Sequence, residues 1–242
     1  MKQFFSILAG LVFLVALLPA SEAANPDASS EIVSRYLTAS DQAPLRGVSQ
    51  EVEFDARLPK LKKEGRLHAL RFITKVGQIR YVADKFVGDN SVKKDVIARY
   101  MAAETQATQT PKPSESAIRP ENYKFKYKGR LDQDGQGVYI FQVNPRKKRV
   151  GLYKGELWID AATYLPVREA GRLVRTPSIF LRKVDFVREY AIVDGHVVPK
   201  HIQSTIQTRF WGPAELNIDF HNLSFHPEAD VSMAGSPAAD LP

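Results

Sequence analysis

A period-two alternation of apolar and polar residues runs through most of this chain and limits the folds it can adopt. The segments 48–58 and 121–129 each place apolar side chains on one parity and charged or polar ones on the other. That is the pattern of a strand with one buried face. Further strands are expected near 65–75, 78–87, 137–144, 150–160, 164–174, 182–193, 196–210 and 214–224. Asp194-Gly195 suits a tight hairpin turn, so the sheet should be antiparallel.

Two stretches follow the helical period instead. Ser29 or Ser30 can cap a first helix, whose apolar side chains continue at helical spacing to Leu37. A second helix is expected at 91–106, with one apolar stripe formed by Val92, Val96, Ile97, Tyr100 and Met101. Residues 105–120 are rich in Thr, Ser, Pro and Gln and predict a flexible linker or lid loop. With the end of the second helix, this loop is expected to form a mobile gate.

The ratio of strands to helices predicts the architecture. Several expected strands are apolar on both parities, for example 138–143, and a strand of that kind is covered on both sides. Two short helices cannot cover a whole face of a sheet this wide, so the sheet should curl around them. We therefore predict a mainly β (α+β) protein: an unclosed antiparallel β-barrel of about 10–11 strands, curled around two helices, with an apolar concave cavity.

The first residues predict export. Lys2 precedes an apolar run from Phe4 to Leu18, and Ser21-Glu22-Ala23 supplies small residues where a signal peptidase reads. We expect a signal peptide at 1–23 that is cut after Ala23, a single domain at 24–226, a flexible tail at 227–242, and a periplasmic protein. An uncleaved anchor is the alternative, although the run is shorter than a typical membrane span.

Chemistry-bearing motifs are few. The chain has no cysteine, which excludes disulfides, cysteine-ligated metals and thiol catalysis. It carries neither a nucleophile elbow nor a glycine-rich phosphate loop. His201, His221 and Asp219 fall on strands expected to be neighbours, but spacing alone gives no converging set of metal ligands. We expect no enzymatic activity, no cofactor and no metal.

A run of basic residues and two tryptophans are candidate interaction sites. Pro145 is followed by Arg146, Lys147, Lys148 and Arg149 in an expected hairpin. Because the leader directs the chain out of the cytoplasm, this run is either a solvated hairpin tip or a docking site for anionic head groups or an acidic partner, not a nucleic-acid site. Trp158 fits core packing or the cavity lining. Trp211, at a strand end, fits a cavity rim, a membrane contact or packing on a hairpin.

Three stretches of the chain resemble the periplasmic lipoprotein-carrier superfamily, which includes LolA, LolB and the sensor domain of RseB. The first is Leu45-Arg46-Gly47-Val48 with the strand that follows, then Pro59-Lys60-Leu61 and Phe86-Val87-Gly88-Asp89 leading into Val96–Tyr100. The second joins Val138–Val143 to Gly155-Glu156-Leu157-Trp158-Ile159-Asp160. The third is Tyr164-Leu165-Pro166-Val167, followed by Val193-Asp194-Gly195 and Val198-Pro199. The resemblance covers roughly 30–225 as a pattern of positions.

The resemblance implies an unclosed antiparallel barrel with a helical lid and a non-enzymatic carrier that shields acyl chains during passage through the periplasm. The partners would be lipid or lipoprotein acyl chains, with an inner-membrane donor and an outer-membrane acceptor, and the protein would be a monomer. The alternative is an envelope sensor or scaffold domain of the same fold that binds a protein partner. By parity, the cavity should be lined by Val52, Phe54, Ala56, Val96, Ile97, Tyr100, Met101, Tyr123, Phe125, Tyr127 and, if its strand keeps register, Trp158.

Overall fold

A computed structural model describes residues 26–109, 115–133 and 135–225. The predicted leader and the predicted tail lie outside these residues. The first helix, α1 (Pro26–Gln42), precedes the sheet. The strands are β1 (Val48–Leu58), β2 (Lys63–Ile73), β3 (Ile79–Gly88), β4 (Tyr123–Gln133), β5 (Gln136–Pro145), β6 (Tyr153–Asp160), β7 (Pro166–Leu173), β8 (Leu181–Val193), β9 (His196–Thr208) and β10 (Pro213–Phe225). A short 3-10 turn, η1 (Pro59–Leu61), joins β1 to β2, and the second helical segment follows β3.

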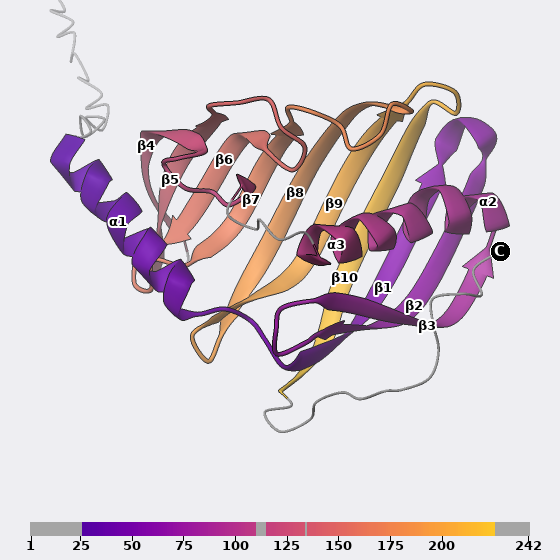
Figure 1. The fold of residues 1–242 in the computed structure, drawn as a ribbon, viewed down its shortest axis with the longest axis horizontal. Coiled ribbons are helices and arrows are strands. Elements are labelled where there is room, and N and C mark those ends of the chain that lie inside the picture. Colours follow the sequence, from indigo (N-terminus) through magenta and orange to yellow (C-terminus); the bar gives the residue numbers. More distant parts are fainter. Residues whose placement is uncertain (1–25, 110–114, 134, 226–242) are drawn as a thin grey trace, which may run out of the picture.

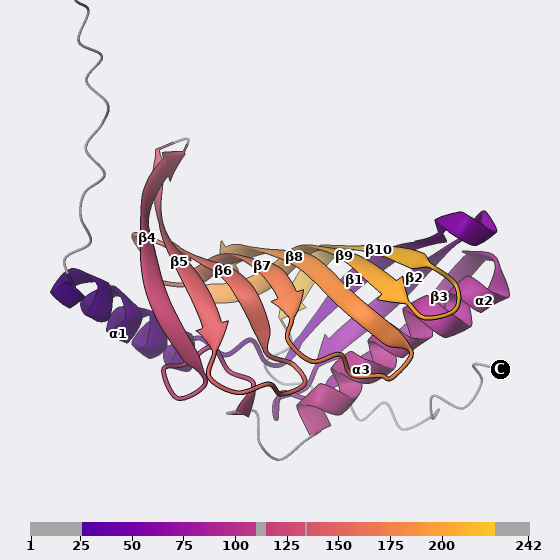
Figure 2. The same cartoon turned by 90° about the horizontal axis from the view of Figure 1, so that it is seen from above.

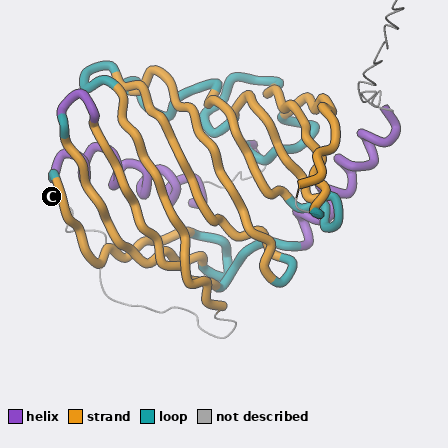
Figure 3. Tube along the Cα trace, turned by 180° about the vertical axis from the view of Figure 1, so that it is seen from behind, coloured by secondary structure: helices purple, strands orange, loops and turns teal. Residues whose placement is uncertain are grey.

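All the strands belong to one sheet in the order β3-β2-β1-β10-β9-β8-β7-β6-β5-β4, and every neighbouring pair is antiparallel. β3 and β4 form the two ends and do not pair with each other, so the barrel stays open. Figure 1 shows the ten strands side by side with the helices in front of them. From behind, in Figure 3, the outer face consists of strands alone. The predicted fold class, an unclosed, curled antiparallel sheet with two helices, is confirmed.

Both helices lie on the concave side of the curved sheet (Figure 2). Each covers a different half. The apolar stripe of the second helix packs on β1, β2 and β10, in a cluster that includes Phe54, Leu67 and Ile218. Helix α1 packs through Tyr36 on a second cluster formed by strands β4, β5, β6 and β8. The core is therefore divided in two, and the middle of the sheet lies between the helices.

Strand register places the apolar parity inward, as alternation predicts. Phe54 of β1 lies opposite Leu67 of β2 and Ile218 of β10, and all three side chains are fully buried. Glu53, one residue earlier, faces His68 and Asp219 on the outer surface. A slip of one residue would exchange the two sets, so the burial of these large side chains holds the register.

The second helix begins where expected and ends later. It comprises α2 (Asn90–Val92), a π-helical turn labelled η2 (Lys93–Ile97) and α3 (Ala98–Gln109). Asp89 caps its start by accepting a hydrogen bond from the Ser91 N–H, at 2.8 Å. The flexible loop predicted from residue 105 is wrong for 105–109, because the Thr108 hydroxyl accepts a hydrogen bond from the Ile79 N–H of β3 and anchors the last turn. Residues 110–114 of that loop lie outside the described residues.

No helix among the described residues is both long enough and apolar enough to cross a membrane.

Candidate functional site

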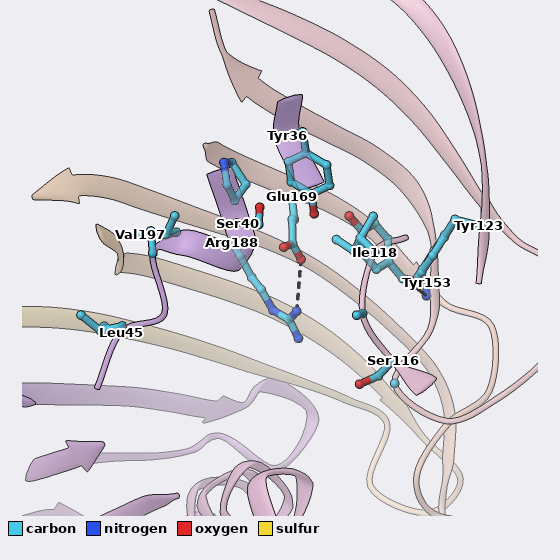
Figure 4. A pocket seen from close by; sticks show the side chains of 14 residues that line it. Tyr36, Ser40, Leu45, Ser116, Ile118, Tyr123, Tyr153, Glu169, Arg188 and Val197 are labelled. Atoms are coloured by element: carbon cyan, nitrogen blue, oxygen red, sulfur yellow. Dashed lines mark hydrogen bonds and ion pairs between the residues drawn. The ribbon is translucent and has the colours of Figure 1, made fainter. Parts of the chain in front are cut away.

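A cleft of about 380 Å³ lies between α1 and the middle of the sheet. Its walls come from α1, the connection that leads from α1 to β1, the segment 116–118, the start of β4, the connection at Gly151, and strands β6 to β9 (Figure 4). The lining residues labelled in the close-up are Tyr36, Ser40, Leu45, Ser116, Ile118, Tyr123, Tyr153, Glu169, Arg188 and Val197. Its volume lies in the range of small-molecule sites, roughly 300–1,000 Å³.

An ion pair lies at the centre of the cleft. Arg188 of β8 lies opposite Glu169 of β7 in the sheet register, and the Arg188 Nη1 atom is 3.3 Å from the Glu169 Oε2 atom. The Glu169 side chain is 11% exposed, whereas the Arg188 side chain, although it points into the concave side of the sheet, is 38% exposed. The two groups thus differ in access, and a molecule in the cleft meets the guanidinium first.

Tyrosines surround the carboxylate of this pair. The Tyr190 hydroxyl donates a hydrogen bond to Glu169, and burial together with that carboxylate raises the pKa of Tyr190 well above its ordinary value. Burial, and then Glu169, raise the pKa values of Tyr36 and Tyr153 as well. Burial raises the pKa of Tyr123 to about 12. At neutral pH these phenols are therefore protonated, and neutral hydroxyl groups lie around the ion pair of Glu169 with Arg188.

Arg188 has unused hydrogen-bonding capacity. A guanidinium carries five N–H donors. Among the described residues its one hydrogen-bond acceptor is Glu169, and the remaining close partner is the Phe186 ring, with Cζ 4.5 Å from the ring centroid. Burial lowers the pKa of the guanidinium, but Tyr190 and Glu169 outweigh this effect and raise it, so the charge is permanent. The cleft therefore presents a fixed cation with free donors to whatever enters it.

A second ion pair fixes α3 to the sheet. Arg71 of β2 faces inward, with Nη2 2.9 Å and Nε 3.4 Å from the two oxygens of Glu104 on α3. The Tyr81 hydroxyl donates to the same carboxylate, and Gln50 accepts from Arg71. Arg71 is almost fully buried. Because both charges are paired and hydrogen-bonded, this group holds the helix against the sheet rather than offering a free site.

Most of the predicted lining residues lie in a packed core and not in the cleft. Val52, Phe54, Ala56, Val96, Ile97 and Met101 are buried in the cluster beneath the second helix, with Tyr100 packed against them. The structure brings these seven residues together as parity and helical spacing predicted. Whether an acyl chain reaches them stays a prediction.

The other predicted lining residues are divided among three positions. Tyr123 is buried and lines the cleft. Phe125 and Tyr127 pack against the cluster beneath α1, where both rings contact Phe141. Trp158 lies on the parity opposite to the buried Leu157 and Ile159, with Arg168 stacked 4.8 Å from its ring centroid. The side chain of Trp158 therefore lies on the outer face of the sheet and not on the face that was expected to line a cavity.

The predicted docking residues lie at the edge of the sheet. Arg146, Lys147, Lys148 and Arg149 form the connection after β5; the first three are exposed, and Arg149 is 3.6 Å from Glu115. His201 and Asp219 meet on the outer face, with the His201 Nδ1 atom 2.7 Å from the carboxylate. No group of three His, Asp or Glu suited to a metal occurs among the described residues.

Arg188 and Glu169 are the functional residues that reasoning from the sequence missed. The cleft is more polar than the apolar cavity that the strand pattern predicts, because these two charges lie on the inward parity. The signal was present: Arg188 has the same parity as the buried Phe186, two residues earlier on an expected strand. A charged side chain at an inward position of a sheet is a candidate site because burial of a charge needs compensation.

The sequence matches no known protein family and no curated protein. In structure the chain is similar to a DUF1329 family protein from Desulfovibrio piger, at 13% identity and a TM-score of 0.41, covering 83% of this chain and 94% of that one. It is similar to a LolA superfamily protein from Nitrosomonas europaea, at 10% identity and a TM-score of 0.39, covering 82% of this chain and 95% of that one. It is also similar to a putative outer membrane lipoprotein-sorting protein domain from Vibrio parahaemolyticus, at 12% identity and a TM-score of 0.41, covering 84% of this chain and 95% of that one.

Proposed function

We propose that this chain is a non-enzymatic binding protein of the cell envelope that holds the acyl chain of a lipid or lipoprotein against the concave face of its sheet. The cleft between α1 and the sheet carries this proposal. Its walls include Leu45, Ile118 and Val197, and the fixed cation Arg188 lies in its centre. A partly apolar wall around an ion pair whose guanidinium has free donors suits an amphiphile, a molecule with an aliphatic chain and a polar head.

The energetics favour this ligand class. Each methylene that leaves water contributes roughly 0.8 kcal/mol, so a chain of moderate length binds without any covalent chemistry. A carboxylate or phosphate on the chain would accept hydrogen bonds from the free N–H groups of Arg188, and charge-assisted bonds of this kind are the strong ones. We therefore assign the head group of the ligand to Arg188 and its chain to the walls around it.

The proposed setting follows from the predicted leader, which directs the mature chain from residue 24 to the periplasm. There the protein would act as a monomeric carrier that accepts an acyl-bearing molecule from an inner-membrane donor and delivers it to an outer-membrane acceptor. Because binding rests on burial and one ion pair, release requires only that α1 or the segment at 116–118 moves away from the cleft.

A titration tests the proposal. The delipidated protein is titrated with dodecanoate in a calorimeter, below the concentration at which the ligand forms micelles. We expect saturable binding of one molecule, weakened at least about tenfold by Val197→Asp, which places a charge in the apolar wall. Val82→Ser, at an exposed position of β3, is the control and should not change the affinity. Absence of binding by the wild-type protein would contradict the proposal.

The alternative function is that of an envelope sensor or scaffold that binds a protein partner. One observation favours it: among the described residues, β3 and β4 each pair with a strand on one side only, and a free sheet edge can pair with an extended peptide. Affinity capture from an envelope extract, combined with lipid analysis of the same sample, separates the two. A stoichiometric protein partner on a protein with an empty cleft would favour the sensor.

A further inference from the structure

The connections after β1, β3, β5, β7 and β9 leave the sheet at one edge, because successive connections in an antiparallel sheet alternate between the two edges. The connection after β3 leads directly into α2. The other four are the segments 59–62, 146–152, 174–180 and 209–212. These segments form the upper edge of the sheet in Figure 1 and are called the basic rim here.

The basic rim carries a concentrated positive charge. Its cationic residues are Lys60, Lys62, Arg146, Lys147, Lys148, Arg149, Arg175 and Arg209, and its four segments contain no Asp or Glu. The acidic residues that adjoin it include Asp89 after β3 and Glu115, which lies 3.6 Å from Arg149, so the eight cations leave this edge positive. At the opposite edge, the described connections 74–78, 161–165 and 194–195 contain Lys75 and Asp194 as their only residues with charged side chains.

Large apolar side chains are exposed among these cations. They are Leu61, Val150, Ile179, Phe180 and Phe210, with 78% of Ile179 and 70% of Phe210 exposed. Water contact of this extent is unfavourable for such side chains, and scattered single residues would need no explanation. Here they recur in all four connections and lie beside Lys or Arg, which points to a surface that is both apolar and cationic.

Two of the connections are held together as one surface. The Arg209 backbone N–H donates to the Phe180 carbonyl at 2.9 Å, and the Arg209 Nε atom donates to the Ile179 carbonyl at 2.6 Å. The rings of Phe180 and Phe210 lie 6.1 Å apart, and Trp211 lies 6.4 Å from Phe210. Lys60 and Leu61 line the same hollow as Phe210. These hydrogen bonds and ring contacts therefore hold the aromatic residues together beyond the ends of the strands.

We propose that the basic rim docks onto an anionic lipid bilayer. Apolar side chains at its tips enter the boundary between head groups and acyl chains, while Lys and Arg contact anionic head groups. Tryptophan favours this boundary because its ring is apolar and its N–H is polar. Gly151 belongs to the rim and also lines the cleft, so docking would place the cleft next to the lipid. The docking does not depend on what the cleft binds.

Vesicle binding tests the proposal. The processed chain, beginning at Ala24, is sedimented with vesicles of phosphatidylcholine alone or mixed with phosphatidylglycerol. We expect binding to the anionic vesicles that weakens in high salt. Charge reversal by Lys147→Glu with Lys148→Glu should weaken it at least about tenfold, since each basic residue near the surface contributes to binding. Ile179→Ser with Phe210→Ser should also weaken it. The matched control is Lys75→Glu with Val76→Ser, at the opposite edge, where Val76 is equally exposed.

Three outcomes would overturn the proposal. The first is that anionic vesicles are not bound at all. The second is that the control pair weakens binding as much as the rim variants do, which would indicate a general charge effect. The third is that the Ile179/Phe210 variant binds like the wild type while an acidic polypeptide competes fully with vesicles, which would make the rim a docking site for an acidic protein. Far-ultraviolet circular dichroism of every variant establishes that the fold is retained.

Discussion

At the residue scale, the pairing of Arg188 with Glu169 sets how the cleft treats a charged ligand. Glu169 and an incoming carboxylate compete for the same guanidinium. Glu169→Gln removes the competitor and should strengthen dodecanoate binding, whereas Arg188→Gln removes the cation that donates hydrogen bonds to the head group and should weaken it. Hydrogen bonds to charged groups contribute about 1.5–3 kcal/mol, so each change should amount to about tenfold or more. Calorimetric titration with dodecanoate and dodecanol measures both.

Opposite changes in dodecanoate affinity for the two variants distinguish a ligand site from an ion pair that only stabilises the fold. If the pair only stabilises the fold, each substitution leaves one charge without its partner and should lower the affinity for both ligands alike. Dodecanol, which has no charge, should bind both variants as it binds the wild type. Arg80→Gln, at an exposed position of β3 on the outer face, is the control for loss of one positive charge. Equal effects of Glu169→Gln and Arg188→Gln on dodecanoate would refute the assignment of the head group.

The sequence could predict apolar inward residues but not the charged pair between the helices. Parity identified Val52, Phe54 and Tyr123 as inward because the alternate positions on their strands are charged or polar. On β8 both parities contain apolar residues, so the pattern alone does not say which parity faces inward. Arg188 shares the parity of Phe186, but this signal can be used only once the strand pairing shows that Phe186 is the buried residue.

At the element scale, the second helix is held on the sheet by its apolar stripe. Ile97 is fully buried among strands β1, β2 and β10, so Ile97→Asp places a carboxylate in an apolar core. We expect a loss of stability on the order of 4 kcal/mol, with a lowered melting temperature in calorimetry. Lys94→Asp, at an exposed position of the same helix, should change stability by no more than about 0.5 kcal/mol.

Similar melting temperatures for the two variants would mean that the stripe does not face the sheet. Ile97 lies in the packed cluster and not in the cleft, so its substitution should affect the stability of the fold without removing a residue that lines the cleft. Lys94 is a strict control since a carboxylate in the first turns of a helix is favoured by the helix dipole.

Elements were predictable from the sequence to the extent that local patterns encode them. The start of the second helix carries its own signal, the Asp89 cap. Its end does not: the last turn, to Gln109, depends on the bond between Thr108 and the Ile79 N–H, which is a contact between distant parts of the chain. The same holds for the division of the core, because no local pattern says which helix covers which strands.

At the scale of the whole molecule, an open sheet with two separate covers would allow the proposed carrier to store and release a ligand. The apolar surface is closed over by α3 on one half and by α1 on the other, and the cleft lies where neither helix closes the sheet fully. The basic rim lies at one end of this arrangement, where the strands meet their connections. The proposed carrier function would thus require motion of a helix or of a short segment, while the sheet stays fixed.

The measurement that tests the central claim most directly is mass spectrometry of the lipid that copurifies with the protein. The chain is expressed with its leader, purified from the periplasm without detergent, and extracted with organic solvent. We predict an acyl-bearing compound with a carboxylate or phosphate head at close to one molecule per protein, and much less of it from Arg188→Gln purified in parallel. A folded wild-type protein that carries no acyl compound, or no more than Arg188→Gln carries, would contradict the account.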